Sequence, residues 1–187
     1  MNTGISVIQK LQLVEMNYLS NITHKVRDSI SWKSCDYALD KTLVSRVLKF
    51  FDVGTPDNDA FASRSNRRFP KFWTKEQDAF SKSWKDKFLW INPPFNQITQ
   101  VIDKLLSEKA YAILIVPKWT WSIWWKYLME HSTDHLMIAR VHGMFLHQGK
   151  YVMQKPRWDA QAFYIDFSES WERTPPWSKK DCCTNGS

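Results

Sequence analysis

A short apolar strand that ends in an amide, two prolines and an aromatic ring constrains this chain more than any other feature. The segment from Leu89 to Phe95 reads Leu-Trp-Ile-Asn-Pro-Pro-Phe. Two adjacent prolines fix φ, remove two backbone donors and disfavour helical geometry at the preceding residue, so the chain must leave the sheet here in an extended turn. We therefore expect the Asn92 side chain to be held at the end of a strand.

An amide oxygen beside exposed carbonyls and a ring suits a planar base that carries an exocyclic amine. The side-chain oxygen of Asn92 and the carbonyl of Pro93 can each accept one N–H of that amine, while Phe95 covers the face of the base. The alternative is structural, because Asn before Pro often does no more than cap a turn.

The order of apolar patterns along the chain predicts an α/β fold. The run from Tyr111 to Val116 is almost continuously apolar, which is typical of a strand buried on both faces of a parallel sheet. Apolar positions at helical spacing predict helices, with Asp40 as the N-cap of the first. We expect helices at 40–51, 97–108 and 122–131, and strands at 57–62, 88–91, 111–116, 135–141 and 161–167. This alternation predicts a mostly parallel sheet with flanking helices.

The length of 187 residues fits a single domain with a substantial core. We expect an N-terminal arm or linker at residues 1–31, the folded domain at 32–172 and a flexible tail at 173–187. No apolar run approaches the length of a membrane span, no secretion signal is recognisable, and the three cysteines form neither a disulfide framework nor a zinc spacing. We expect an intracellular protein of a reducing compartment, cytoplasm or nucleus, without a metal.

Positive charge is concentrated just before the apolar strand. The net charge is +7, and residues 63–87 contain eight basic residues against three acids. This distribution favours a polyanionic partner, although a charged run can also be only a solvated face.

Asn-Pro-Pro-Phe after an apolar strand is similar to the catalytic signature of DNA amino-methyltransferases that use S-adenosylmethionine. The chain resembles the small phage-type Dam adenine methyltransferases and the methyltransferase-like segments of some retroelements. The resemblance runs in order from Trp32 to Phe167 and includes Asp59 to Ala62, Asn66, Asp78, Trp84, the tetrapeptide and Val116-Pro117. It implies a Rossmann-like methyltransferase fold and an enzyme that methylates N6 of a flipped-out adenine in DNA.

The resemblance also implies the roles of particular residues. The catalytic residues would be Asn92, Pro93, Pro94 and Phe95, and the S-adenosylmethionine site would contain Asp59, Ala60, Phe61, Ala62, Asn66 and Asp78. Nucleic acid would be bound by Arg64, Arg67, Arg68, Lys71, Lys118, Trp119 and Trp121. The acids are also common as loop caps, and the tryptophans as core residues.

One departure from the wider methyltransferase pattern concerns the cofactor site. The chain has only five glycines and no glycine-rich turn after its first predicted strand. The alternative function is therefore a catalytically inactive, retroelement- or phage-derived nucleic-acid-binding module. Methylation of RNA or of protein glutamine shares the tetrapeptide geometry, so RNA is a possible substrate beside DNA, and the oligomeric state stays open.

Overall fold

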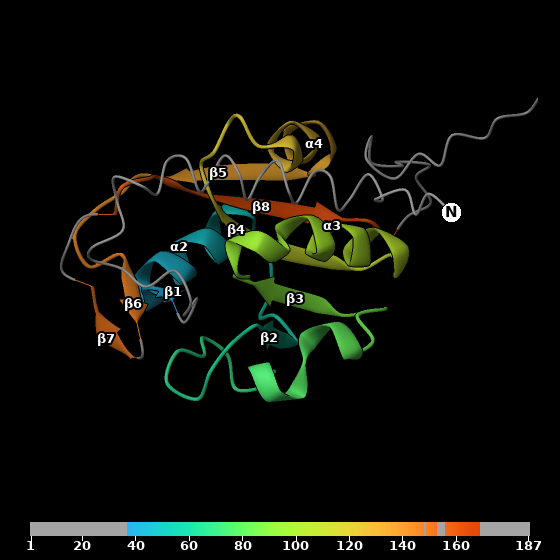
Figure 1. Cartoon of the computed structure of the whole chain (residues 1–187), viewed down its shortest axis with the longest axis horizontal. Coiled ribbons are helices and arrows are strands. Elements are labelled where there is room, and N and C mark those ends of the chain that lie inside the picture. The colour runs from blue at the N-terminus through green and yellow to red at the C-terminus, as the bar shows by residue number, and fades with distance from the viewer. Residues whose placement is uncertain (1–36, 148, 153–155, 169–187) are drawn as a thin grey trace, which may run out of the picture. The chain divides into compact units, whose positions relative to one another are not determined.

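The computed structural model describes residues 37–147, 149–152 and 156–168, all within one compact unit (Figure 1). The predicted arm at 1–31 and the predicted tail at 173–187 lie outside the described residues. None of the described helices is long and apolar enough to cross a membrane.

The central sheet has five strands in the order β2-β3-β4-β8-β5. The bounds are Asn58–Ala60 for β2, Phe88–Ile91 for β3, Tyr111–Pro117 for β4, Asp134–Ile138 for β5 and Ala160–Asp166 for β8. Strands β2, β3 and β4 pair in parallel, so that Ala60, Ile91 and Leu114 form one row across the sheet. The predicted helix and strand alternation is confirmed in this α/β domain.

The prediction of a mostly parallel sheet is not confirmed, because the sheet is mixed. Strand β8 pairs antiparallel with both β4 and β5. A parallel connection needs a long crossover, usually a helix, and the described chain between β5 and β8 contains only short strands. The chain therefore returns to the sheet between β4 and β5 in the opposite direction.

In the described part of the chain, three α-helices cover the sheet: α2 at Lys41–Phe50, α3 at Ile98–Ser107 and α4 at Ile123–His131. Asp40 caps α2 as predicted, since its carboxylate accepts the N–H of Thr42 at 2.9 Å. Val44 and Val47 of α2 join a core on one face of the sheet. The other face is covered by α3 and α4, where Trp125 packs edge to face on Phe163 (Figure 1).

A second, antiparallel sheet of order β1-β6-β7 was not predicted. Its strands are Tyr37–Leu39, Phe145–His147 and Lys150–Tyr151. Strands of two or three residues are too short to show an alternating pattern, so only their pairing defines them. This sheet joins the start of the described chain to its last third, because Tyr37 pairs with His147.

Candidate active site

Asn92 follows the last residue of β3, and its side-chain amide is fixed by a strand of the small sheet. Its Nδ2 donates to the backbone carbonyl of Tyr37 at 2.7 Å. A carbonyl can only accept, so this bond defines which end of the amide faces Tyr37. The side-chain oxygen is directed away from that bond, and among the described residues it has no hydrogen-bond donor. Asn92 is half-buried.

The two prolines hold the backbone beyond Asn92 in an extended turn. Pro93 is buried and Pro94 is half-buried. The Pro94 carbonyl accepts the N–H of Gln97 at 2.9 Å and so begins the short 3-10 helix η3 at Phe95–Gln97. Within the described part of the chain, no hydrogen bond uses the Pro93 carbonyl. Neither the Asn92 side-chain oxygen nor the Pro93 carbonyl thus has a hydrogen-bond donor among the described residues, and their role as acceptors for a base stays a prediction.

Phe95 belongs to an aromatic cluster beside this turn, which contains four side chains among the described residues. Trp119 and Trp158 both meet the Phe95 ring edge to face, with ring centroids at 5.1 and 5.5 Å. Trp121 stacks on Trp119 at 6.2 Å with an interplanar angle of 18°. Trp119 is buried, whereas Trp121 is 60% exposed. The cluster thus has a fixed inner part and one ring that faces solvent.

Trp158 is the residue of this cluster that the sequence analysis missed. It lies two residues before β8, whose first residue pairs with Pro117 at the end of β4. Antiparallel β8 therefore begins where β3 and β4 end. The segment is held by Lys118, whose N–H donates to the Asp159 carbonyl at 2.7 Å, and by Arg140, whose N–H donates to the Asp159 carboxylate at 2.9 Å. In the sequence, Trp158 is recognisable only as an aromatic residue just before a predicted strand. This position places it beside the Asn-Pro-Pro-Phe turn only if β8 is known to run antiparallel to β4.

Trp124 and Trp125 are core residues of α4 with 0% and 8% exposure. Lys118 is half-buried, and its ammonium lies 3.3 Å from the sulfur of Met137.

Asp59 lies near the end of β2 and is 4% exposed. Its carboxylate accepts the N–H of Arg68 at 2.6 Å. Burial raises the pKa of Asp59 to about 7, although the hydrogen bonds from the N–H groups of Arg68 and Phe69 and the charge of Arg68 act in the opposite direction. The predicted cofactor acid is therefore enclosed by the loop that follows β2.

The turn after β2 takes a glycine-like conformation without a glycine. Ala60 is buried, and Phe61 follows it with φ of 64°. The N–H of Ala62 then donates to the carbonyl of Trp73 at 3.1 Å, so the turn is held by the segment around Phe72, which forms a parallel bridge with Asp59. A left-handed residue here is usually glycine, because other side chains are strained in this region. The chain thus reaches this turn at a cost that a glycine would avoid.

Asn66 is 3% exposed and links two parts of the fold. Its side-chain oxygen accepts the N–H of Gly149 at 2.8 Å, in the turn between β6 and β7. Its backbone carbonyl accepts Nε of Arg68 at 2.9 Å. The structure therefore gives this predicted cofactor residue a partner in the hairpin.

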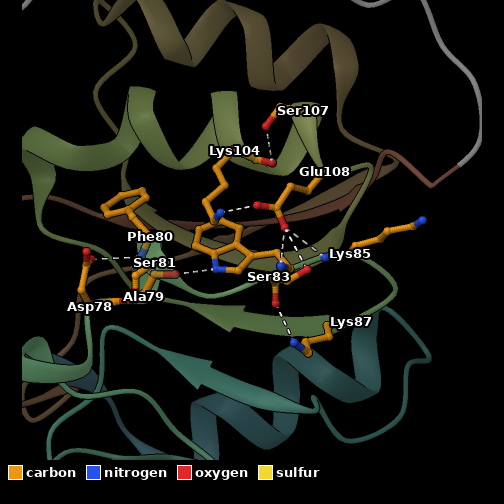
Figure 2. A network of polar contacts seen from close by, with 11 residues as sticks. Asp78, Ala79, Phe80, Ser81, Ser83, Lys85, Lys87, Lys104, Ser107 and Glu108 are labelled. Carbon is orange, nitrogen blue, oxygen red and sulfur yellow. Dashed lines mark hydrogen bonds and ion pairs between the residues drawn. The ribbon is translucent and has the colours of Figure 1, made fainter.

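Asp78 is exposed and caps a short 3-10 helix, η2 at Ala79–Ser81, by accepting the N–H of Phe80 at 3.1 Å. The segment around it is anchored to the end of α3, where Glu108 points toward Ser83 and Lys85 and the ammonium of Lys104 is joined to Glu108 (Figure 2).

Glu108 accepts the backbone N–H groups of Trp84 and Lys85 and forms an ion pair with Lys104. Burial alone would raise the pKa of Glu108, but these hydrogen bonds and the ammonium together lower it. Asp78 therefore belongs to an ordered segment.

Most of the predicted nucleic-acid-binding cations lie in the loop between β2 and β3. Arg64, Arg67 and Lys71 are exposed, and Arg68 is half-buried next to Asp59. The guanidinium of Arg67 lies 5.0 Å from the centre of the Phe72 ring. This region is loop with short helical turns, namely η1 at Lys75–Gln77 and η2.

The model of the Dam family, described as DNA N-6-adenine-methyltransferase, matches residues 25–167. The chain belongs to the Dam family. The match includes both sheets, the Asn-Pro-Pro-Phe turn and Trp158. Dam family membership supports methylation of adenine in DNA as the general activity, with DNA as the expected substrate.

No curated protein and no solved structure matches the chain. Within the described part of this Dam family member, no group of three or more His, Cys, Asp or Glu could hold a metal ion.

Proposed function

We propose that this chain transfers a methyl group from S-adenosylmethionine to the exocyclic amine of an adenine that is flipped out of DNA. The observation that carries the proposal is the hydrogen bond from Asn92 to the Tyr37 carbonyl. It turns Nδ2 toward the Tyr37 carbonyl, so the side-chain oxygen would be left to accept a hydrogen bond from the adenine amine beside Pro93, the next residue.

The two acceptors would hold the adenine amine and stabilise it as it reacts. The side-chain oxygen of Asn92 and the carbonyl of Pro93 each accept one N–H, which turns the nitrogen lone pair toward the methyl group. Positive charge grows on this nitrogen during the transfer, so both acceptors bind the transition state more tightly than the ground state. Because neither acceptor needs to move, the arrangement is prepared before the substrate arrives.

The aromatic cluster would hold the flipped base. A base within a duplex is inaccessible, and extruding it costs a few kcal/mol that contacts in the pocket must offset. Phe95 is held edge-on by Trp119 and Trp158, so its orientation is fixed. Trp121 is exposed and stacked on Trp119, so it would extend the aromatic surface toward a base.

The residues after β2 and before β3 would hold the cofactor. S-adenosylmethionine carries hydroxyl, ammonium and amine groups that need acceptors, and its sulfonium supplies an activated methyl group when bound. The exposed carboxylate of Asp78 fits an amine, and Asp59, Ala60, Phe61 and Ala62 form the turn at the end of the strand. Asp59 fits as an acceptor only if the loop that encloses its carboxylate opens or if it binds the cofactor through its backbone.

The test of the proposal is the substitution Asn92→Ala, with Asn96→Ala as the matched control. Asn96 is an exposed amide four residues further along the chain. Removing one preorganised hydrogen-bonding group from a catalytic site typically lowers the rate by about 100- to 1,000-fold. We expect Asn92→Ala to lose N6-methyladenine formation on this scale, measured by mass spectrometry of digested DNA, while Asn96→Ala stays active.

Binding of S-adenosylmethionine to Asn92→Ala, measured by calorimetry, should be retained. An active Asn92→Ala protein would overturn the assignment of this residue.

A second candidate is a DNA-binding module that has lost the cofactor. The enclosed carboxylate of Asp59 favours it, because the hydrogen bond from Arg68 occupies one of the predicted cofactor acceptors. Calorimetry separates the two functions. A folded protein that binds DNA but not S-adenosylmethionine supports this second function and rejects the first.

A further inference from the structure

The loop after β2 and the hairpin β6-β7 are joined at a close contact. We use "basic loop" for residues 63–71 and "hairpin" for the described residues of β6 and β7 with Gly149. The Asn66 side chain accepts the N–H of Gly149 at 2.8 Å. A Cβ on Gly149 would lie 3.3 Å from the Ser65 carbonyl, and Gly149 has φ of 77°. The hairpin is therefore seated directly against the basic loop.

The hairpin is also joined to the candidate active site. Its residue His147 pairs with Tyr37, and the Tyr37 carbonyl holds the Asn92 amide. On β7, the hydroxyl of Tyr151 donates to the carboxylate of Asp40 at 2.9 Å. A continuous series of contacts thus runs from the basic loop through the hairpin to Asn92.

The charges of this region are arranged so that cations face outward and acids face inward. Arg64, Arg67 and Lys71 of the basic loop and Lys150 of the hairpin are exposed. Asp40 and Asp59 are 9% and 4% exposed. Their carboxylates are engaged by Tyr151 and by the N–H of Arg68, respectively. Glu76 also acts electrostatically on this surface: the hydrogen bond from Thr74 lowers its pKa most, and the charges of Lys75 and Arg64 lower it further.

We propose that the basic loop and the hairpin form one surface that binds the phosphates of the DNA strand next to the flipped adenine, and that the Asn66–Gly149 hydrogen bond holds its two halves together. The inference rests on the proposed function and adds to it the location of the DNA. Backbone phosphates fit because the surface offers separate cations rather than an apolar groove.

The first test measures DNA affinity across a salt series, with the full chain and a fluorescent duplex. Arg64→Ala and Lys150→Ala come from the two halves of the surface. The control is Lys126→Ala on α4, whose side chain is 82% exposed. Each lost phosphate contact should weaken binding several-fold and reduce the slope of log affinity against log salt by about 0.9. The control should match the unaltered protein.

The second test asks whether Asn66 joins the two halves. In the background of Asn66→Ala, the effect of Lys150→Ala on DNA affinity should shrink toward 1-fold, because the hairpin is no longer held beside the loop. Gly149→Ala should have the same effect through the crowding at Ser65, and circular dichroism shows whether each variant is folded. An equal effect of Lys150→Ala in both backgrounds would overturn the role of Asn66.

If Lys150→Ala and Lys126→Ala behave alike, the hairpin is not part of the surface. These measurements use no cofactor, so their outcome is separate from that of the proposed methyl transfer. Loss of S-adenosylmethionine binding with an intact salt response would reject the proposed function and leave the DNA-binding surface in place.

Discussion

Asn92 and Tyr37 lie 55 positions apart, and a hydrogen bond of 2.7 Å joins the side chain of one to the backbone carbonyl of the other. Asn92→Asp tests this relationship more sharply than removal of the side chain. A carboxylate keeps the acceptors but places a negative charge against the Tyr37 carbonyl. We expect the free energy of unfolding at pH 7 to fall by about 1–3 kcal/mol, as for an unsatisfied polar group. Urea denaturation measures it, and wild-type stability of this variant would contradict the bond.

The stability of the protein should depend on the ionisation of Asp59. Burial raises the pKa of this carboxyl from 3.8 to about 7. Between these values the folded state binds a proton that the unfolded state has released, so the free energy of unfolding falls as pH rises and levels off above about 7. Asp59→Asn should remove this fall, which is on the order of a few kcal/mol. Urea denaturation at pH 5 and pH 8 measures it, with the exposed Asp86→Asn as control; equal slopes for wild type and Asp59→Asn would reject the prediction.

The backbone at position 61 should prefer glycine to alanine once the ring is absent. Phe61 has φ of 64°, and its ring packs against Phe80 and Trp84. Both Phe61→Ala and Phe61→Gly lose this packing, but only alanine keeps the strain of a left-handed residue. We expect Phe61→Gly to be more stable than Phe61→Ala by about 1 kcal/mol. Thermal denaturation of the pair decides the question, and the reverse order would show that the turn relaxes without the ring.

Glu108 should contribute more to stability than a similar glutamate on α4. Glu108 is 26% exposed, pairs with Lys104 and accepts two backbone N–H groups, whereas Glu130 is 53% exposed and has an ion pair of 3.7 Å with Lys126. We expect Glu108→Ala to cost about 2 kcal/mol, because the part-buried N–H of Trp84 and the N–H of Lys85 both lose their acceptor. Glu130→Ala should cost less than about 0.5 kcal/mol. Equal losses in denaturant titrations would show that the contacts in Figure 2 do not anchor the segment that contains Asp78.

Substitution of the two stacked tryptophans should affect different properties, the stability of the fold in one case and DNA binding in the other. Trp119 is 8% exposed and contacts Phe95, whereas Trp121 is 60% exposed. Trp119→Ala should cost about 3–5 kcal/mol, as for other large-to-small core changes. Trp121→Ala should leave the melting temperature nearly unchanged and weaken binding of a duplex that contains a mismatched adenine. Normal binding by Trp121→Ala would remove this ring from the base-holding role.

The sequence alone predicts correctly those helices and strands whose apolar residues follow a clear helical or strand pattern. The apolar run from Tyr111 to Val116 and the helical spacing from Ile98 to Leu105 each correspond to an element in the structure, β4 and α3. Asn92 was placed at the end of β3 because two prolines allow little else. In these segments local preference and tertiary packing agree.

The direction of β8 and the existence of the small sheet could not be predicted from the sequence, because both depend on pairing between residues far apart in the chain. The pattern from Ala160 to Asp166 is the same whichever way a buried strand runs. Strand β1 has three residues and exists through pairing with residues more than 100 positions away. Trp158 and the partner of Asn66 depend on the same long-range pairings, so no motif in their own neighbourhood could identify them.

The bond to Asn92 uses the carbonyl of Tyr37, which every amino acid at position 37 would carry. No side-chain substitution there can delete it directly. In a scan of single substitutions, every residue at position 37 would keep this bond. The scan would therefore not show that the Asn92 amide depends on position 37. The requirement is the register of β1 with β6, in which Tyr37 faces His147. A one-residue insertion or deletion near β1 would therefore disturb the Asn92 amide more effectively than any exchange of a single residue in that strand.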